Sequence, residues 1–199
     1  NGVGNLETLE AVLGPQRVAL GVTTLGATLL GPGLVRQVGE GAISLSPHPR
    51  LAELTTWLQK AGFTVEQVAD ARGLLWGKLV INAAINPLTA LLRVTNGELL
   101  ESSTAHELLQ AAAREAAAVA NAQGLTLPYP DPVGMAETVA RRTAANRSSM
   151  LQDILRDAPT EIDAICGAVV RAGEQAGVPT PVNRTLWQLV KATQKPERS

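Results

Sequence analysis

The chain changes character near Asp70, and this change limits the folds that it can adopt. Before Asp70, residues 17–29 and 34–45 are rich in Val, Thr, Leu and Ile, which favours strands, and Gly31-Pro32-Gly33 predicts a turn between them. After Asp70, apolar residues recur with helical spacing almost to the end of the 199 residues. The sequence therefore predicts a short α/β part followed by an all-helical part.

Helix and strand limits follow from capping residues and from glycine. In the first part, residues 49–61 predict a helix that ends at Gly62, and residues 63–68 predict a short strand. Capping patterns, Thr104 with Glu107 and Thr160 with Asp163, mark two helix starts in the second part. The helices predicted there are 72–92, bent by Pro87, then 104–123, 131–150, 151–156, 160–176 and 181–192.

Composition argues against several classes of protein. The net charge is −1 and aromatic residues make up 3%, so neither a basic phosphate-binding face nor a base-stacking surface is expected, which excludes a dedicated nucleic-acid binder. Residues 74–92 are apolar but contain Lys78, Asn82 and Asn86, which predicts a core helix and no membrane span.

Cysteine content and the first residues predict the cellular setting. Cys166 is the one cysteine, and no Cys/His cluster suggests a metal site, so we expect no bound metal. A basic segment followed by an apolar run is missing at the start of the chain, so we expect a cytoplasmic protein. Because the chain begins with Asn1, we also expect it to be part of a longer protein.

A polar stripe on an apolar helix is the main candidate for a site. Lys78, Asn82 and Asn86 are spaced i, i+4 and i+8, so they lie along one face of the predicted helix. Their neighbours are apolar nearly all round, so we expect protein to surround the stripe, and a lysine there needs an anionic partner or a lowered pKa. The alternative is that Lys78 reaches solvent while the asparagines pack or cap.

Other polar residues have ordinary explanations when taken singly. Glu161 falls in the first turn of a predicted helix, where an acid favours the helix dipole. Ser149 is a surface serine by default, and Asn96-Gly97 is typical of a turn.

Taken together, four segments resemble one enzyme family. The segments 78–90, 96–99, 148–154 and 160–163, in this order, are similar to the 2-dehydropantoate 2-reductases, also called ketopantoate reductases. The resemblance implies an α/β fragment plus an all-α part. Residues 1–69 would be a partial Rossmann-type sheet edge, the remnant of an NADP-binding domain, and residues 70–199 a helical substrate-binding and catalytic domain like the C-terminal domain of 6-phosphogluconate dehydrogenase.

The resemblance also implies roles for individual residues. Lys78 would be the general acid that protonates the carbonyl oxygen, and Glu161 would be its catalytic partner that binds the substrate hydroxyl. Asn1 would lie at the junction of nicotinamide and substrate. Four further residues match substrate-binding positions: Asn82, Asn86, Asn96 and Ser149.

The glycine-rich turn of this family is not found in the sequence. Gly2-Val3-Gly4 is followed by Glu7 where a third glycine should stand, and Gly39-Glu40-Gly41 continues to Ser44. We therefore expect NADP, as NADPH, to be bound mainly by a segment that precedes this chain, and the isolated chain to be a truncated, inactive form.

The predicted function is NADPH-dependent reduction of ketopantoate to pantoate, a step of pantothenate and coenzyme A biosynthesis. Two alternatives stay open: reduction of a different 2-keto acid, and a non-catalytic helical module for dimerisation or scaffolding. The alanine-rich helix over residues 104–123 suits a homodimer through the helical domain. The expected partners are otherwise a small 2-keto acid, with no nucleic acid and no membrane.

Overall fold

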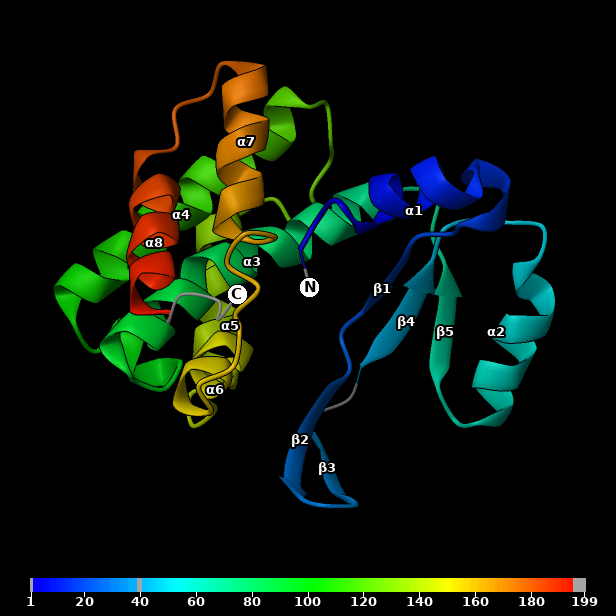
Figure 1. Ribbon diagram of the computed structural model, residues 1–199, viewed down its shortest axis with the longest axis horizontal. Coiled ribbons are helices and arrows are strands. Elements are labelled where there is room, and N and C mark those ends of the chain that lie inside the picture. Colours follow the sequence, from blue (N-terminus) through cyan, green and yellow to red (C-terminus); the bar gives the residue numbers. More distant parts are fainter. Residues whose placement is uncertain (1, 39–40, 195–199) are drawn as a thin grey trace, which may run out of the picture. The chain divides into compact units, whose positions relative to one another are not determined.

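The computed structural model describes residues 2–38 and 41–194 and divides into two compact units (Figure 1). The first contains residues 5–74, and the second contains residues 2–4 together with residues 75–194. The boundary near residue 74 falls four residues into a helix that begins at Ala71. The predicted arrangement of a small sheet followed by a helical domain is confirmed.

The first unit combines short strands with short helices. Its helical elements are α1 (Asn5–Leu13), the 3-10 turn η1 (Pro15–Arg17) and α2 (Leu51–Lys60). Its strands are β1 (Gly21–Thr23), β2 (Gly26–Gly31), β3 (Leu34–Val38), β4 (Ala42–Leu45) and β5 (Thr64–Gln67). α1 was not expected from the sequence.

A three-stranded sheet in the order β1-β4-β5 forms the centre of this unit. β1 pairs antiparallel with β4, and β4 pairs parallel with β5, so that Ile43 lies beside Val65. α2 connects these two parallel strands and packs against β5, which makes a βαβ unit. Gly62 ends the helix region with a φ of 89°, as predicted.

β2 and β3 form a separate hairpin, which Figure 1 shows extending beyond the three-stranded sheet. The predicted turn is confirmed, and Gly33 adopts a φ of 74° there. Residues 17–29, whose composition favours strands, are divided between two sheets, because the chain leaves the three-stranded sheet after β1. The backbone N–H of Leu25 donates a hydrogen bond to the Thr23 hydroxyl, and this local turn separates β1 from β2.

Helices make up the second unit. They are α3 (Ala71–Leu92), which starts in the first unit, the 3-10 turn η2 (Gly97–Leu100), α4 (Ser103–Ala122), α5 (Pro132–Arg142), α6 (Ser149–Leu155), α7 (Cys166–Ala176) and α8 (Pro181–Thr193). α3 is long and apolar enough to cross a membrane, but 67% of its most apolar window is buried in the protein, as expected of a core helix.

The alanine-rich helix α4 lies at the centre of the helical packing. It contacts α5, α7 and α8, and small side chains allow these helices to approach closely. Its buried alanines are Ala105, Ala112, Ala113, Ala116, Ala117 and Ala120. Since these alanines pack inside the unit, they are not the surface through which a second copy of the chain would dock.

Three predicted helix limits are wrong. Ser102, and not Thr104, caps α4 by accepting a hydrogen bond from the N–H of Ala105. Residues 143–148 separate α5 from α6, because carbonyl oxygens at Ala144 and Asn146 accept hydrogen bonds from the 96–97 backbone. The helix predicted over residues 160–176 is α7, and it begins only at Cys166.

Candidate active site

α3 carries three of the predicted site residues on one face. Lys78 and Asn82 are half-buried, and Asn86 is buried with 6% of its surface exposed. The positions around them, including Leu79 and Val80, are among the most buried of the protein. Protein therefore packs on the other faces of α3 and covers the stripe at Asn86, while Lys78 and Asn82 stay partly accessible.

Lys78 is under two opposing electrostatic influences. Burial lowers the pKa of its ammonium group below the ordinary value of 10.5, because the charged form loses hydration. The Glu161 carboxylate acts in the opposite direction and raises the pKa of Lys78. Glu161 is itself half-buried, so the two side chains, which are 83 positions apart in the sequence, interact in a setting that is partly screened from water.

The Glu161 turn, residues 160–165, is a compact segment that precedes α7. The carbonyl oxygen of Glu161 accepts hydrogen bonds from the N–H groups of Ala164 and Ile165, both at 3.0 Å. The prediction that Glu161 belongs to the first turn of a helix is wrong, since α7 begins five residues later. A favourable helix dipole therefore does not explain this acid.

Contacts with α7 and α8 hold the Glu161 turn on one side. The Asp163 carboxylate accepts hydrogen bonds from Trp187 Nε1 at 2.7 Å and from Lys191 Nζ at 3.1 Å. The guanidinium group of Arg171 donates to the Asp163 carbonyl oxygen at 2.8 Å. The Asp163 carbonyl oxygen thus accepts its hydrogen bond from a side chain of α7, and the Asp163 carboxylate ties the turn to α8.

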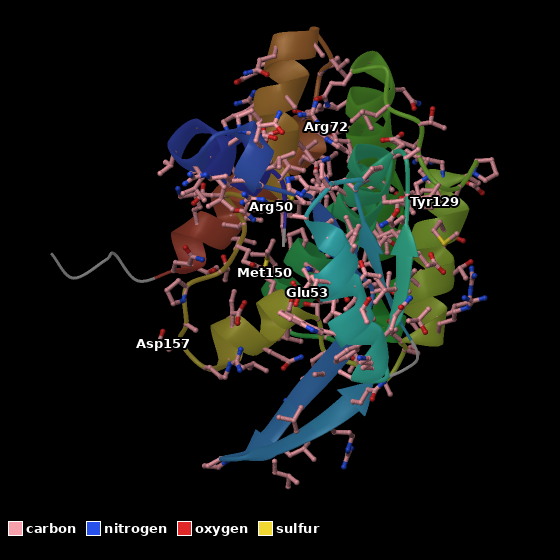
Figure 2. The ribbon with its side chains drawn as sticks, turned by 90° about the vertical axis from the view of Figure 1, so that its right-hand side faces the viewer. Arg50, Glu53, Arg72, Tyr129, Met150 and Asp157 are labelled. Atoms are coloured by element: carbon pink, nitrogen blue, oxygen red, sulfur yellow. The ribbon has the colours of Figure 1, made fainter. Side chains whose placement is uncertain are left out.

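α6 brings Ser149, another predicted site residue, to the stripe on α3. Asn86 Nδ2 donates a hydrogen bond to the Ser149 hydroxyl at 3.5 Å. Ser148 precedes Ser149 and caps α6, because its hydroxyl accepts from the N–H of Leu151 at 3.1 Å and from the Thr89 hydroxyl at 2.7 Å. Met150, labelled in Figure 2, anchors the same helix in the core with 1% of its surface exposed.

Asn96 lies on the loop between α3 and η2, and its amide Nδ2 donates to the Thr143 hydroxyl at 2.8 Å. Its Oδ1 is buried and has no hydrogen-bond partner within the described part of the chain. The remaining predicted residue, Asn1, lies outside the described residues, so its role stays a prediction.

Close packing beside Lys78 involves residues that the sequence analysis missed. Tyr129, labelled in Figure 2, lies between α4 and α5, and its hydroxyl donates to the Gly77 carbonyl oxygen at 2.6 Å. A Cβ at Gly77 would come within 2.6 Å of Pro128 Cδ, so only glycine fits at this point of α3. The one available signal was a glycine inside a helical pattern, one position before the lysine.

The described residues contain no group of three or more His, Cys, Asp or Glu side chains arranged to hold a metal ion. Cys166 is buried, and burial raises the pKa of its thiol, which suits a small core residue better than a nucleophile.

Known proteins with similar sequences point to one family. The family model described as Ketopantoate reductase PanE/ApbA C terminal matches residues 70–194, and the model described as Ketopantoate reductase PanE/ApbA matches residues 1–50. A 2-dehydropantoate 2-reductase of Archaeoglobus fulgidus is 40% identical over 98% of this chain. The chain spans 66% of the length of that relative.

Solved structures give the same result. A PanE/ApbA family ketopantoate reductase from Ralstonia eutropha is 36% identical, with a TM-score of 0.87 over 97% of this chain and 64% of that one. A D-mandelate dehydrogenase in a ternary structure with NADH and anilino(oxo)acetate is 29% identical, with a TM-score of 0.87 over 97% of this chain and 65% of the other. From the family match over most of its length, together with these relatives, the chain belongs to the ketopantoate reductase family.

Proposed function

We propose that this chain is the substrate-binding and proton-donating part of an NADPH-dependent 2-dehydropantoate 2-reductase, which reduces ketopantoate to pantoate for pantothenate and coenzyme A synthesis. The observation that carries the proposal is the half-buried Lys78 on α3 in electrostatic contact with Glu161. Reduction of a ketone places negative charge on the carbonyl oxygen. A fixed ammonium group stabilises that charge and can donate the proton.

In this proposal, the polar residues of the site have different roles in catalysis and substrate binding. Lys78 donates a proton from Nζ to the carbonyl oxygen, and Glu161 keeps the ammonium protonated and accepts a hydrogen bond from the substrate hydroxyl. A 2-keto acid also carries a carboxylate, for which neutral amide and hydroxyl donors are suited. Those donors would be Asn82, Asn86, Asn96 and Ser149.

The chain's own residues fit the substrate side of this reaction better than the phosphate side of the cofactor. When bound, the nicotinamide supplies the hydride. The described residues include no strand followed by a Gly-x-Gly-x-x-Gly turn, so we assign pyrophosphate binding to none of them. The proposal places Asn1 beside the nicotinamide. The choice of NADP over NAD is part of the proposal, while the similar D-mandelate dehydrogenase is described with NADH.

A different 2-keto acid is the second candidate substrate. The similarity to a D-mandelate dehydrogenase, at 29% identity and a TM-score of 0.87, favours it. Ketopantoate and an aryl 2-keto acid can be compared as substrates under the same conditions. A larger kcat/KM for the aryl acid would move the assignment from ketopantoate to that class.

Two further parts of the proposal concern the setting of the enzyme. We place the protein in the cytoplasm, as expected of a biosynthetic reductase whose most apolar helix is a core element. We also propose a homodimer through the helical unit, on surfaces other than the buried alanines of α4.

The test uses the whole protein as its gene encodes it, with NADPH and ketopantoate. Lys78→Ala should lower kcat by at least about a hundredfold, in line with the contribution of a positioned general acid. Lys60→Ala is the matched control, because Lys60 is an exposed lysine at the end of α2. Full activity of the Lys78→Ala protein would show that this lysine is not the acid.

A further inference from the structure

A glycine near the start of the chain packs directly on the turn that carries Glu161. Gly2 has a φ of 87°, a conformation that favours glycine. A Cβ at this position would lie 2.1 Å from the carbonyl oxygen of Ala164 and 2.7 Å from its side chain. The Gly2 backbone therefore approaches the Glu161 turn more closely than any other residue type would allow.

Val3, the next residue, adds a hydrogen bond to this contact. The backbone N–H of Val3 donates a hydrogen bond to the Ala164 carbonyl oxygen at 3.3 Å, and the Val3 side chain packs on the core of the helical unit. Residues 2–4 belong to that unit, whereas the chain from Asn5 onwards belongs to the other unit. Segment 2–4 is thus bound to Ala164 of the Glu161 turn, and the chain leaves the helical unit directly after this segment.

The opposite side of the Glu161 turn is held independently. Asp163 binds Trp187 and Lys191 of α8, and Arg171 of α7 binds the Asp163 carbonyl oxygen. A side chain at residue 2 would therefore displace segment 2–4 more readily than the turn. To reach a contact of 3.0 Å, the distance from the Ala164 oxygen has to grow by about 0.9 Å, the difference between 3.0 and 2.1 Å.

We propose that Gly2 is a positioning residue that fixes segment 2–4 against the Glu161 turn and so sets the spacing of the reactants at the catalytic carboxylate. This inference rests on the proposed function, in which Asn1 borders the nicotinamide and Glu161 binds the substrate hydroxyl. Displacing a wall of the site by about 1 Å misaligns bound reactants without removing a group that binds them, and such a misplacement costs up to about a hundredfold in rate.

The experiment compares Gly2→Ala with two control variants in the whole protein. Gly14→Ala and Gly62→Ala introduce the same left-handed strain, with φ values of 83° and 89°, but a Cβ at either position meets no atom within 4 Å. In Gly2→Ala, kcat should fall by about tenfold to a hundredfold, while KM for the 2-keto acid changes by less than about threefold. Both controls should lose much less activity.

Amide hydrogen exchange gives a readout that does not depend on activity. The Val3 amide should be protected in the unaltered protein, and its exchange should become at least about tenfold faster in Gly2→Ala, while the core amides of α3 stay protected. If Gly2→Ala does not fold, Val3→Pro is the alternative variant, because it removes the Val3 N–H donor without adding a Cβ at residue 2. In Val3→Pro, kcat should fall as well.

Each outcome decides between the inference and the proposed function. An unprotected Val3 amide in the unaltered protein, unchanged exchange in Gly2→Ala, or an equal loss of kcat in a control would overturn the role of Gly2 and leave the reductase proposal intact. If the unaltered protein reduces no 2-keto acid with NADPH, the proposed function fails, and the catalytic role of Gly2 fails with it. Hydrogen exchange then still decides whether Gly2 anchors segment 2–4.

Discussion

At the scale of single residues, Lys78 shows how burial and a neighbouring charge together set the strength of an acid. Burial among the apolar side chains of α3 lowers its pKa, and the Glu161 carboxylate limits that decrease. A general acid works best when its pKa approaches the working pH, so a lysine with a lowered pKa is better suited to proton donation than an exposed one. The same burial would make an unpaired ammonium costly.

The pH dependence of kcat follows from these two influences. The protonated form of Lys78 is the active one, so kcat should fall as the pH rises through its pKa, below the ordinary lysine value of 10.5. In Glu161→Gln the carboxylate no longer raises the pKa, so this alkaline limb should move to lower pH. The measurement is the pH–kcat profile of both proteins.

The exposed Glu66 of β5 provides the control for this prediction. Glu66→Gln removes one negative charge but should leave the alkaline limb in place. A limb that stays unchanged in Glu161→Gln, or that moves to higher pH, would contradict the assigned interaction between Lys78 and Glu161.

At the scale of helices, the site depends on where α6 begins. Ser148 caps this helix and also accepts a hydrogen bond from Thr89 of α3, so the position of Ser149 is tied to the stripe that carries Asn86. Ser102 caps α4 in the same way, but it is exposed and its bond to the N–H of Ala105 is longer, at 3.4 Å. The two caps therefore differ in burial and in tertiary contacts.

Replacing each cap by alanine separates these effects. Ser102→Ala should lower the free energy of unfolding by about 1 kcal/mol, the usual cost of a lost N-cap. Ser148→Ala should cost about 2 kcal/mol, because it also removes the hydrogen bond with the buried Thr89 hydroxyl, which keeps the Ile85 and Asn86 carbonyl oxygens as acceptors. Denaturant unfolding followed by circular dichroism measures both values, and equal losses would mean that the Thr89 contact contributes nothing.

At the scale of the whole molecule, the two units differ in how much apolar surface they bury. In the described part of residues 5–74, the buried apolar side chains are Val22, Leu45, Leu51 and Ala71. The helical unit buries a continuous cluster that extends from Trp76 to Val190. Since apolar burial is the dominant favourable contribution to folding, the smaller unit should be the less stable one.

Calorimetry tests this difference. We expect two thermal transitions, with residues 5–74 unfolding at the lower temperature and the helical unit at the higher temperature. Hydrogen exchange below the first transition assigns the units, because amides of β4 and β5 should exchange while those of α4 stay protected. A single transition in which both sets exchange together would contradict separate unfolding.

Much of the fold could be predicted from local patterns. The turn before Gly33, the end of α2 at Gly62, and the stripe of Lys78, Asn82 and Asn86 depend on residues close in sequence, because glycine conformations and helical spacing are local properties. The division of residues 17–29 between two sheets could not be predicted in this way. It depends on which strands each part finds as partners.

The sequence by itself determined the chemical groups of this protein, the succession of a small sheet and a helical domain, and the turns at Gly33 and Gly62. Only the tertiary structure decided that Glu161 lies in a turn outside α7 and that the Gly2 backbone approaches this turn. The physical reason is that these features depend on carbonyl groups, charges and close contacts that distant segments supply, and no local periodicity encodes which distant groups will meet.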